Sequence, residues 1–185
     1  MLSKTLTAII CYSQMDNNIP PKPVHLGEAK LREFFIDHLN RIYCAKTHVV
    51  KRFREVAGLA HFKDIFHALN ETADDVEKQI FRMQMIYSLM DTKYREGICS
   101  GMTGMLDEAL VAIYEEDSDT ALRDMAILFY LQNIEGIEAA SFQVLQIVSR
   151  KLKNTDVQQL IRENFDEAKE DRALLLMITA RYIAS

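Results

Sequence analysis

The sequence predicts an all-α protein: a bundle of four long helices in which one long crossover carries a short extra helix. Residues that break helices are scarce beyond residue 23, because all three prolines precede residue 24 and the 185 residues include only six glycines. Beyond the prolines, apolar residues recur at helical spacing in several long stretches. With 49% hydrophobic and 26% charged residues, the chain has the composition of a soluble globular protein with a sizeable core.

The first two long helices are predicted on either side of Gly58. The stretch from residue 31 to 58 carries apolar residues with a period of about 3.6. They are Leu31, Phe34, Phe35, Leu39, Ile42, Val49, Val50, Phe53 and Val56. The stretch from residue 62 to 90 repeats this pattern and ends before Gly97. A short turn at Gly58 makes the two helices antiparallel.

The crossover is predicted over residues 93–117, where Gly97, Gly101 and Gly104 cluster around Cys99. It contains one short helix from about residue 105 to 114. Two further long helices follow, from about residue 119 to 152 and from 155 to the C-terminus, with Thr155 as the expected N-cap of the last.

The predicted connectivity is hairpin, long crossover, hairpin. Each long helix of about 30 residues spans about 45 Å at about 1.5 Å per residue. This is the topology of ferritin-like bundles. A three-helix coiled coil or a helical-repeat solenoid is the alternative, but no self-similarity with a period of about 30 to 45 residues supports repeats.

Residues 1–26 are predicted to be a flexible leader, and residues 27–185 a single domain. The apolar run near the N-terminus is too short for a signal peptide and is followed by no small-residue cleavage site. No stretch has the roughly 18 to 20 apolar residues that a membrane span requires. We therefore expect a bacterial cytoplasmic protein without membrane association.

Net charge and cysteine content argue against nucleic-acid binding, a disulfide framework and a zinc site. A formal charge of -5 and a pI near 5.6 leave no basic surface for nucleic acid. The three cysteines, Cys11, Cys44 and Cys99, have no CxxC spacing, so we expect neither a disulfide nor a zinc site, and a reducing compartment. A redox role of Cys99 in the crossover remains an alternative.

A polar layer interrupts the apolar face of each long helix near its middle. The polar residues that interrupt it are Lys46, Glu77, Gln132, Glu135, Glu138, Glu167 and Asp171. Carboxylates from several helices are what a di-iron or di-manganese centre requires. If a metal site is retained, we expect its ligands to be Glu77, Glu135, Glu138 and Glu167.

Histidine content argues against such a centre. Carboxylate-bridged bundles take an imidazole from a Glu-x-x-His pair on each of two helices, yet the last histidine here is His67, which we expect at the surface. His38 lies on the apolar face of the first helix and is predicted to be a hydrogen-bonded core residue. Lys46 is a second objection, because an ammonium group has no lone pair and repels a divalent cation.

The segment LREFFIDHLNRIYCAKTHVVK resembles the opening helix of the YciE/YciF-type ferritin-like family of bacterial stress-associated proteins. The resemblance continues through Glu77, Gln79 and Arg82, through ICSGMTGM around Cys99, and through ALRDMAIL to IEGIEAASF, and covers about residues 31–175. It implies a homodimer.

This chain departs from the family pattern where acids and histidine would bind metal. Where the family's opening helix reads Tyr-x-Ala-Glu, Lys46 replaces the acid. Where the third bundle helix reads Val-Glu-His-Tyr-Glu, Gly136 replaces the histidine. In the last helix, Ala168 stands between Glu167 and Lys169, and Arg172 lies near an expected Asp.

The sequence thus predicts a non-enzymatic, stress-associated ferritin-like protein without a cofactor. Its degenerate di-metal site would be replaced by a salt-bridge network in which Lys46 and Arg172 supply the cations. The alternative is an iron or manganese oxidase or ferroxidase that uses carboxylates alone. A third reading is a carrier of a small apolar ligand, since nine Met and nine Phe residues can line an adaptable cavity.

Overall fold

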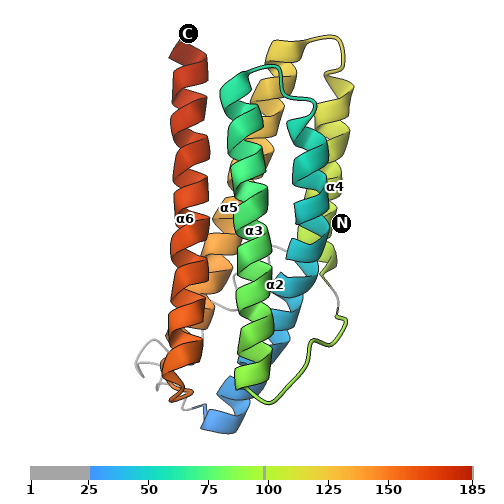
Figure 1. Ribbon diagram of the computed structural model, residues 1–185. Helices are drawn as coiled ribbons and strands as arrows, with labels where there is room; N and C mark the ends of the chain where they lie inside the picture. Colours follow the sequence, from blue (N-terminus) through green and yellow to red (C-terminus); the bar gives the residue numbers. More distant parts are fainter. Residues whose placement is uncertain (1–25, 98, 185) are drawn as a thin grey trace, which may run out of the picture.

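The computed structural model describes residues 26–97 and 99–184 (Figure 1). Within these ranges the chain forms helices and no strand. The helices are α2 (Glu28–Ala57), α3 (Lys63–Leu89), α4 (Ser100–Glu115), α5 (Thr120–Ser149) and α6 (Thr155–Ala184). The predicted leader, apart from residue 26, lies outside the described residues.

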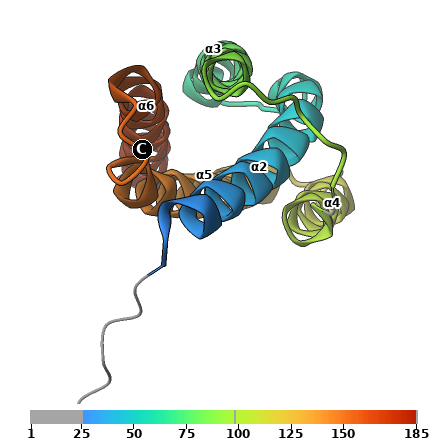
Figure 2. The same cartoon turned by 90° about the horizontal axis from the view of Figure 1, so that it is seen from below.

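The predicted bundle with one crossover is confirmed. α2 and α3 form one hairpin, α5 and α6 form the other, and the crossover between them carries α4 (Figure 1). α2 and α6 run in one direction along the bundle, while α3 and α5 run in the opposite direction. α4 packs outside the four long helices, against α2 and α5 (Figure 2).

The core consists of two apolar clusters, one toward each end of the bundle. One cluster includes Val49, Phe53, Val76, Ile134 and Leu175. The other includes Ile42, Met83, Ala139, Phe142 and Ala168. Every long helix passes through both clusters, so each has a short segment between them at mid-bundle.

The turn between α2 and α3 is completed by a side chain of α5. Both carboxylate oxygens of the fully buried Asp124 accept backbone hydrogen bonds, from the N–H groups of His61 and Phe62 at 2.9 Å each. Buried backbone N–H groups require such partners. Asp124 therefore joins the two hairpins at one end of the bundle.

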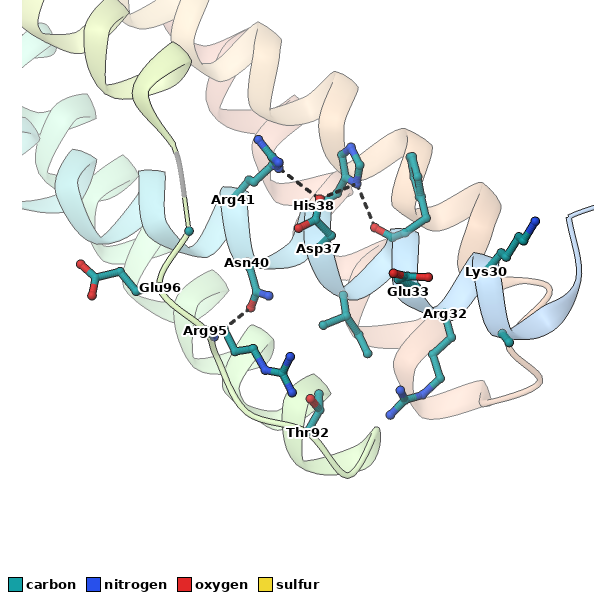
Figure 3. Close-up of a pocket in the computed structure, with 14 residues that line it drawn as sticks. Lys30, Arg32, Glu33, Asp37, His38, Asn40, Arg41, Thr92, Arg95 and Glu96 are labelled. Carbon is teal, nitrogen blue, oxygen red and sulfur yellow. Dashed lines mark hydrogen bonds and ion pairs between the residues drawn. The ribbon is translucent and has the colours of Figure 1, made fainter.

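A hydrogen bond and a disulfide link the crossover to α2. The Asn40 Oδ1 atom accepts hydrogen bonds from the Arg95 backbone N–H at 3.3 Å (Figure 3) and from the Tyr87 hydroxyl at 2.9 Å. Cys44 and Cys99 form a disulfide with their Cα atoms 6.1 Å apart. The expectation that these cysteines remain unpaired is therefore wrong; Cys11 lies outside the described residues.

Two predicted helix boundaries also need correction. α4 begins at Ser100 rather than near residue 105, so Gly101 and Gly104 lie inside the helix. No described glycine has a positive φ, so neither residue acts as a helix breaker. The cap of α6 is Asn154 rather than Thr155, because its Oδ1 atom accepts from the N–H groups of residues 156 and 157 at 3.1 Å each.

Among the described helices, none combines the length and the apolar character that crossing a bilayer requires.

Candidate functional site

A layer of buried polar side chains crosses the bundle between the two apolar clusters. Each long helix contributes to this layer: Lys46 from α2, Thr72 and Gln79 from α3, Glu135 and Glu138 from α5, and Asp171 from α6. Lys46 lies between Ile42 and Val49 along α2, which belong to opposite clusters. The same helical spacing that buries the clusters therefore directs these polar residues inward.

The centre of the layer is an ion pair between Lys46 and Glu138. The Lys46 Nζ atom donates to Glu138 Oε2, and both side chains are completely buried. The ammonium group also lies 5.5 Å from the centre of the Phe142 ring. A side chain this deeply buried stays charged only when a group of opposite charge pairs with it.

Glu135 lies one helical turn from Glu138 and has no comparable partner. It is fully buried, and neither carboxylate oxygen has a hydrogen-bonding partner among the described residues. Burial, followed by the negative charge of Glu138, raises the pKa of Glu135 well above its usual value, and the positive charge of Lys46 opposes this only in part. Burial therefore favours the protonated, neutral form of the Glu135 carboxyl.

Asp171 supplies the third acid of the layer. Its Oδ1 atom accepts from the Thr72 hydroxyl at 3.4 Å. Burial, together with the nearby charge of Asp75, raises the pKa of Asp171 to about 7. The layer thus contains a carboxyl group that exchanges its proton near neutral pH.

Gln79 completes the layer from α3. Its side chain is fully buried, and neither amide atom has a partner among the described residues. The sequence pattern placed Asp171 among the polar interruptions of the last helix but not among the expected ligands, and it assigned no role in the site to Gln79 or Thr72. Their signal was helical phase: Asp171 lies four residues before the buried Leu175 and three after the buried Ala168.

Three of the residues predicted for this layer lie elsewhere. Glu77 is exposed and pairs with Arg54 at 2.8 Å, because it follows the buried Val76 by one residue and so points away from the core. Glu167 lies at the edge of the bundle, where Arg82 binds both carboxylate oxygens at 2.5 and 3.0 Å.

Arg172 is the third. Its side chain is exposed and passes over Gly136 of α5, where its Nε atom would lie 3.6 Å from an added Cβ. The prediction that Arg172 supplies a cation to the layer is therefore wrong, and Lys46 is the only cation in it among the described residues.

The layer does not fit a two-metal centre of the carboxylate-bridged type. The Lys46 ammonium group binds one of the acids and would lie close to any cation there. Among the described residues, the central acids form no group of three potential ligands. Of the described histidines, His48, His61 and His67 are exposed and His38 is half-buried. His38, predicted to be a core residue, instead places Nδ1 2.9 Å from the carbonyl oxygen of Phe34 at the surface.

A surface cleft of about 790 Å³ lies between the first half of α2 and residues 92–97 of the crossover (Figure 3). Its lining includes cations such as Arg32 and Arg95 and anions such as Glu33 and Asp37. Charges of both signs are interspersed, so the cleft selects no particular class of ligand. The buried layer remains the candidate site.

Comparison with known proteins places this chain in a family. Residues 30–184 match the family described as "Domain of unknown function (DUF892)". Protein YciF of Escherichia coli (strain K12) is 24% identical over 140 residues, which cover 75% of this chain and 84% of YciF.

Two solved structures share the fold. The crystal structure of the E. coli stress protein YciF has a TM-score of 0.79 at 20% identity and covers 84% of this chain and 98% of its own. YcfI from Rhodopseudomonas palustris has a TM-score of 0.75 at 21% identity and covers 85% of this chain and 97% of its own. The chain therefore belongs to the DUF892 family of YciE/YciF-type helical-bundle proteins.

Proposed function

We propose that this chain is a non-enzymatic, ferritin-like, stress-associated protein of the bacterial cytoplasm in which an ion pair replaces a di-metal centre. The observation that carries the proposal is the completely buried Lys46 ammonium group on Glu138. The similarity to YciF, which is described as a stress protein, supports the biological setting.

Charge balance supports the replacement. Glu135, Glu138 and Asp171 carry three carboxyl groups into one buried layer, and ionising all three would cost free energy through burial and mutual repulsion. Lys46 compensates Glu138, and the raised pKa values of Glu135 and Asp171 favour the neutral, protonated forms of these two carboxyl groups. Protons and one ammonium group thus take the role that metal ions have in a carboxylate-bridged bundle.

Measurement of metal content, combined with the Lys46→Glu variant, tests the proposal. We expect the untagged wild-type protein to contain no stoichiometric iron or manganese by elemental analysis, and its melting temperature to be unaffected by Fe²⁺ or Mn²⁺. Lys46→Glu restores an acid and removes the only cation of the described layer, so it should lower the melting temperature without metal. Added Fe²⁺ or Mn²⁺ should then raise the melting temperature of this variant.

The alternative function is an iron- or manganese-dependent oxidase or ferroxidase with carboxylate ligands alone. The unpaired Glu135 carboxyl favours this alternative, because its oxygens are free to bind a cation. About two equivalents of iron or manganese in the wild-type protein, lost in Glu135→Gln, would establish it and overturn the ion-pair proposal. An unchanged melting temperature of Lys46→Glu, with and without metal, would also count against the ion pair.

We further propose that the chain forms a homodimer through the outer face of α5. Large apolar side chains follow this helix on its solvent side: Leu122, Phe129, Ile137, Val144 and Ile147 are between 42% and 62% exposed. Contiguous exposed apolar surface marks interaction sites. The family resemblance also supports a homodimer.

A further inference from the structure

The crossover meets α2 at a cluster of three potential metal ligands that is separate from the buried layer. The Sγ atoms of Cys44 and Cys99 and a ring nitrogen of His48 lie within 4.8 Å of one another. Cys44 and His48 are four residues apart on α2, so both project from one face. Cys99 comes from the residue that precedes α4.

A backbone carbonyl group fixes the tautomer of His48. Its Nδ1 atom lies 2.8 Å from the carbonyl oxygen of Cys44. Because a carbonyl only accepts, the proton resides on Nδ1, and the lone pair on Nε2 is available to a metal. A backbone carbonyl that fixes the histidine tautomer is a common feature around bound zinc.

Disulfide formation and metal binding are mutually exclusive here. In the oxidised state the two sulfur atoms are bonded to each other. Zinc requires deprotonated thiols. The Cα atoms, 6.1 Å apart, lie within the usual range for a disulfide, so both states are compatible with this backbone arrangement.

We propose that reduction of the Cys44–Cys99 disulfide converts this cluster into a Zn²⁺ site with Cys44, Cys99 and His48 as ligands. In the reduction step, two molecules of a small thiol are oxidised to one disulfide, and their protons and electrons yield the two cysteine thiols. Zn²⁺ then displaces both thiol protons and binds the two sulfurs and the imidazole. Water fills the fourth position, since His48 is exposed and the cluster offers only three protein ligands.

The site would act as a redox-controlled connection between the crossover and α2. A covalent bond holds the crossover under oxidising conditions, and a metal bridge holds it after reduction. In the absence of both, the Asn40 side chain remains as a polar contact between α2 and the crossover.

The test uses the full-length Cys11→Ser protein, which leaves Cys44 and Cys99 as the only thiols. Alkylation of the denatured, unreduced protein should modify no cysteine, and two after treatment with a phosphine reductant. Zn²⁺ is then titrated in competition with a chromophoric chelator. We expect one Zn²⁺ per reduced chain and none per oxidised chain. Co²⁺ in place of Zn²⁺ should produce thiolate-to-metal charge-transfer absorption only after reduction.

His38 provides the matched control for His48. Both are histidines of α2 with Nδ1 close to a carbonyl oxygen four residues earlier, but His38 is half-buried where His48 is exposed, and no cysteine pair adjoins His38. His48→Ala should weaken Zn²⁺ binding by about 100-fold or more, since loss of an outer-shell partner alone typically costs about 10- to 100-fold. His38→Ala should leave the affinity unchanged.

Several results would overturn the proposal. These are two alkylated cysteines in the unreduced protein, equal Zn²⁺ binding before and after reduction, no binding to the reduced Cys11→Ser protein, or equal loss of affinity in the two histidine variants. The titration and the Co²⁺ spectrum of the Cys11→Ser protein need no substitution of Cys44, Cys99 or His48, so a misfolded site variant would not prevent a decision. None of these outcomes depends on whether Lys46 replaces a metal in the buried layer.

Discussion

At the scale of single residues, the Lys46–Glu138 ion pair determines how the middle of the bundle responds to substitution. Both groups are fully buried, so removal of either leaves a charge that neither water nor a partner compensates. Replacing both by neutral groups of similar size removes that penalty. The two kinds of substitution are therefore expected to have very different effects.

Lys46→Met should destabilise the protein by about 3–5 kcal/mol, because it leaves Glu138 buried and unpaired. The double variant Lys46→Met/Glu138→Gln should recover most of this loss, since it leaves no unpaired charge. Urea unfolding followed by circular dichroism measures both. The matched exposed pair is Arg54 and Glu77, where the same analysis should give a much smaller coupling than the buried pair, because water screens both charges. A double variant as unstable as Lys46→Met would contradict this account.

Because folding raises the pKa of the Asp171 carboxyl, we expect the free energy of unfolding to depend on pH. This pKa rises from an ordinary value of 3.8 to about 7 on folding, so the folded state binds the proton more tightly than the unfolded state. The stabilisation is complete below about pH 4 and is lost as the pH rises toward 7. Asp171→Asn removes this titration. Relative to the wild type, the variant should gain about 2 kcal/mol between pH 5 and pH 8.

Urea midpoints at pH 5, 6, 7 and 8 would measure this difference. Glu77→Gln is the control, because it removes an exposed carboxylate outside the layer, and its pH dependence should follow that of the wild type. If Asp171→Asn and the wild type showed parallel pH dependence, the Asp171 carboxyl would not be the group that releases a proton near neutral pH.

The residues of the layer were only partly predictable from sequence. Lys46, Glu135 and Glu138 were found because they interrupt an apolar face in phase with it. Glu77 was misplaced by one residue, a rotation of about 100° around a helix, and Arg172 was placed inside although it is exposed. Which of several adjacent polar residues faces inward depends on how each helix is rotated in the bundle, and periodicity determines that rotation only approximately.

At the scale of elements, the predicted start of α4 was about five residues too late because of its glycines. Gly101 and Gly104 were interpreted as loop residues, but both adopt helical backbone conformations within α4. Packing of Leu106, Leu110 and Ile113 against the bundle stabilises the helix despite the low helical propensity of glycine. The boundaries at the turn between α2 and α3 were predicted to within one residue, because Gly58 marks that turn.

Gly104→Ala should therefore stabilise the protein by about 0.5–1 kcal/mol. The residue is helical and exposed, and an added Cβ would meet no atom within 4 Å. Thermal unfolding of the oxidised protein measures the effect. Gly58→Ala is the contrasting case, because that residue ends α2 and its Cβ would approach the Glu55 carbonyl oxygen at 3.4 Å. A loss of stability in Gly104→Ala would show that the start of α4 is not helical.

At the scale of the whole molecule, the bundle and its crossover were predictable because proline and glycine are sparse and the apolar periodicity is long. The disulfide was not. Cys44 and Cys99 are separated by 55 residues, and their proximity depends on how the crossover docks against α2. Such docking leaves no signature in local sequence pattern.

The proposed dimer is also a property of the whole molecule. Phe129→Glu combined with Val144→Glu should convert it to a monomer, because two charges would enter the apolar face of α5. Light scattering coupled to size-exclusion chromatography measures the mass. Phe81→Glu is the control, since Phe81 is equally exposed, at 61%, but lies on α3. Dissociation by Phe81→Glu alone would move the interface away from α5.

The Asp124 carboxylate has a consequence for biogenesis. During synthesis the α2–α3 hairpin emerges from the ribosome before Asp124 does, so the N–H groups of His61 and Phe62 lack this carboxylate partner at that stage. The nascent chain can complete this turn only after the start of α5 has emerged. Maturation of the first hairpin thus waits for the second half of the polypeptide, which makes the two halves interdependent from the moment of translation.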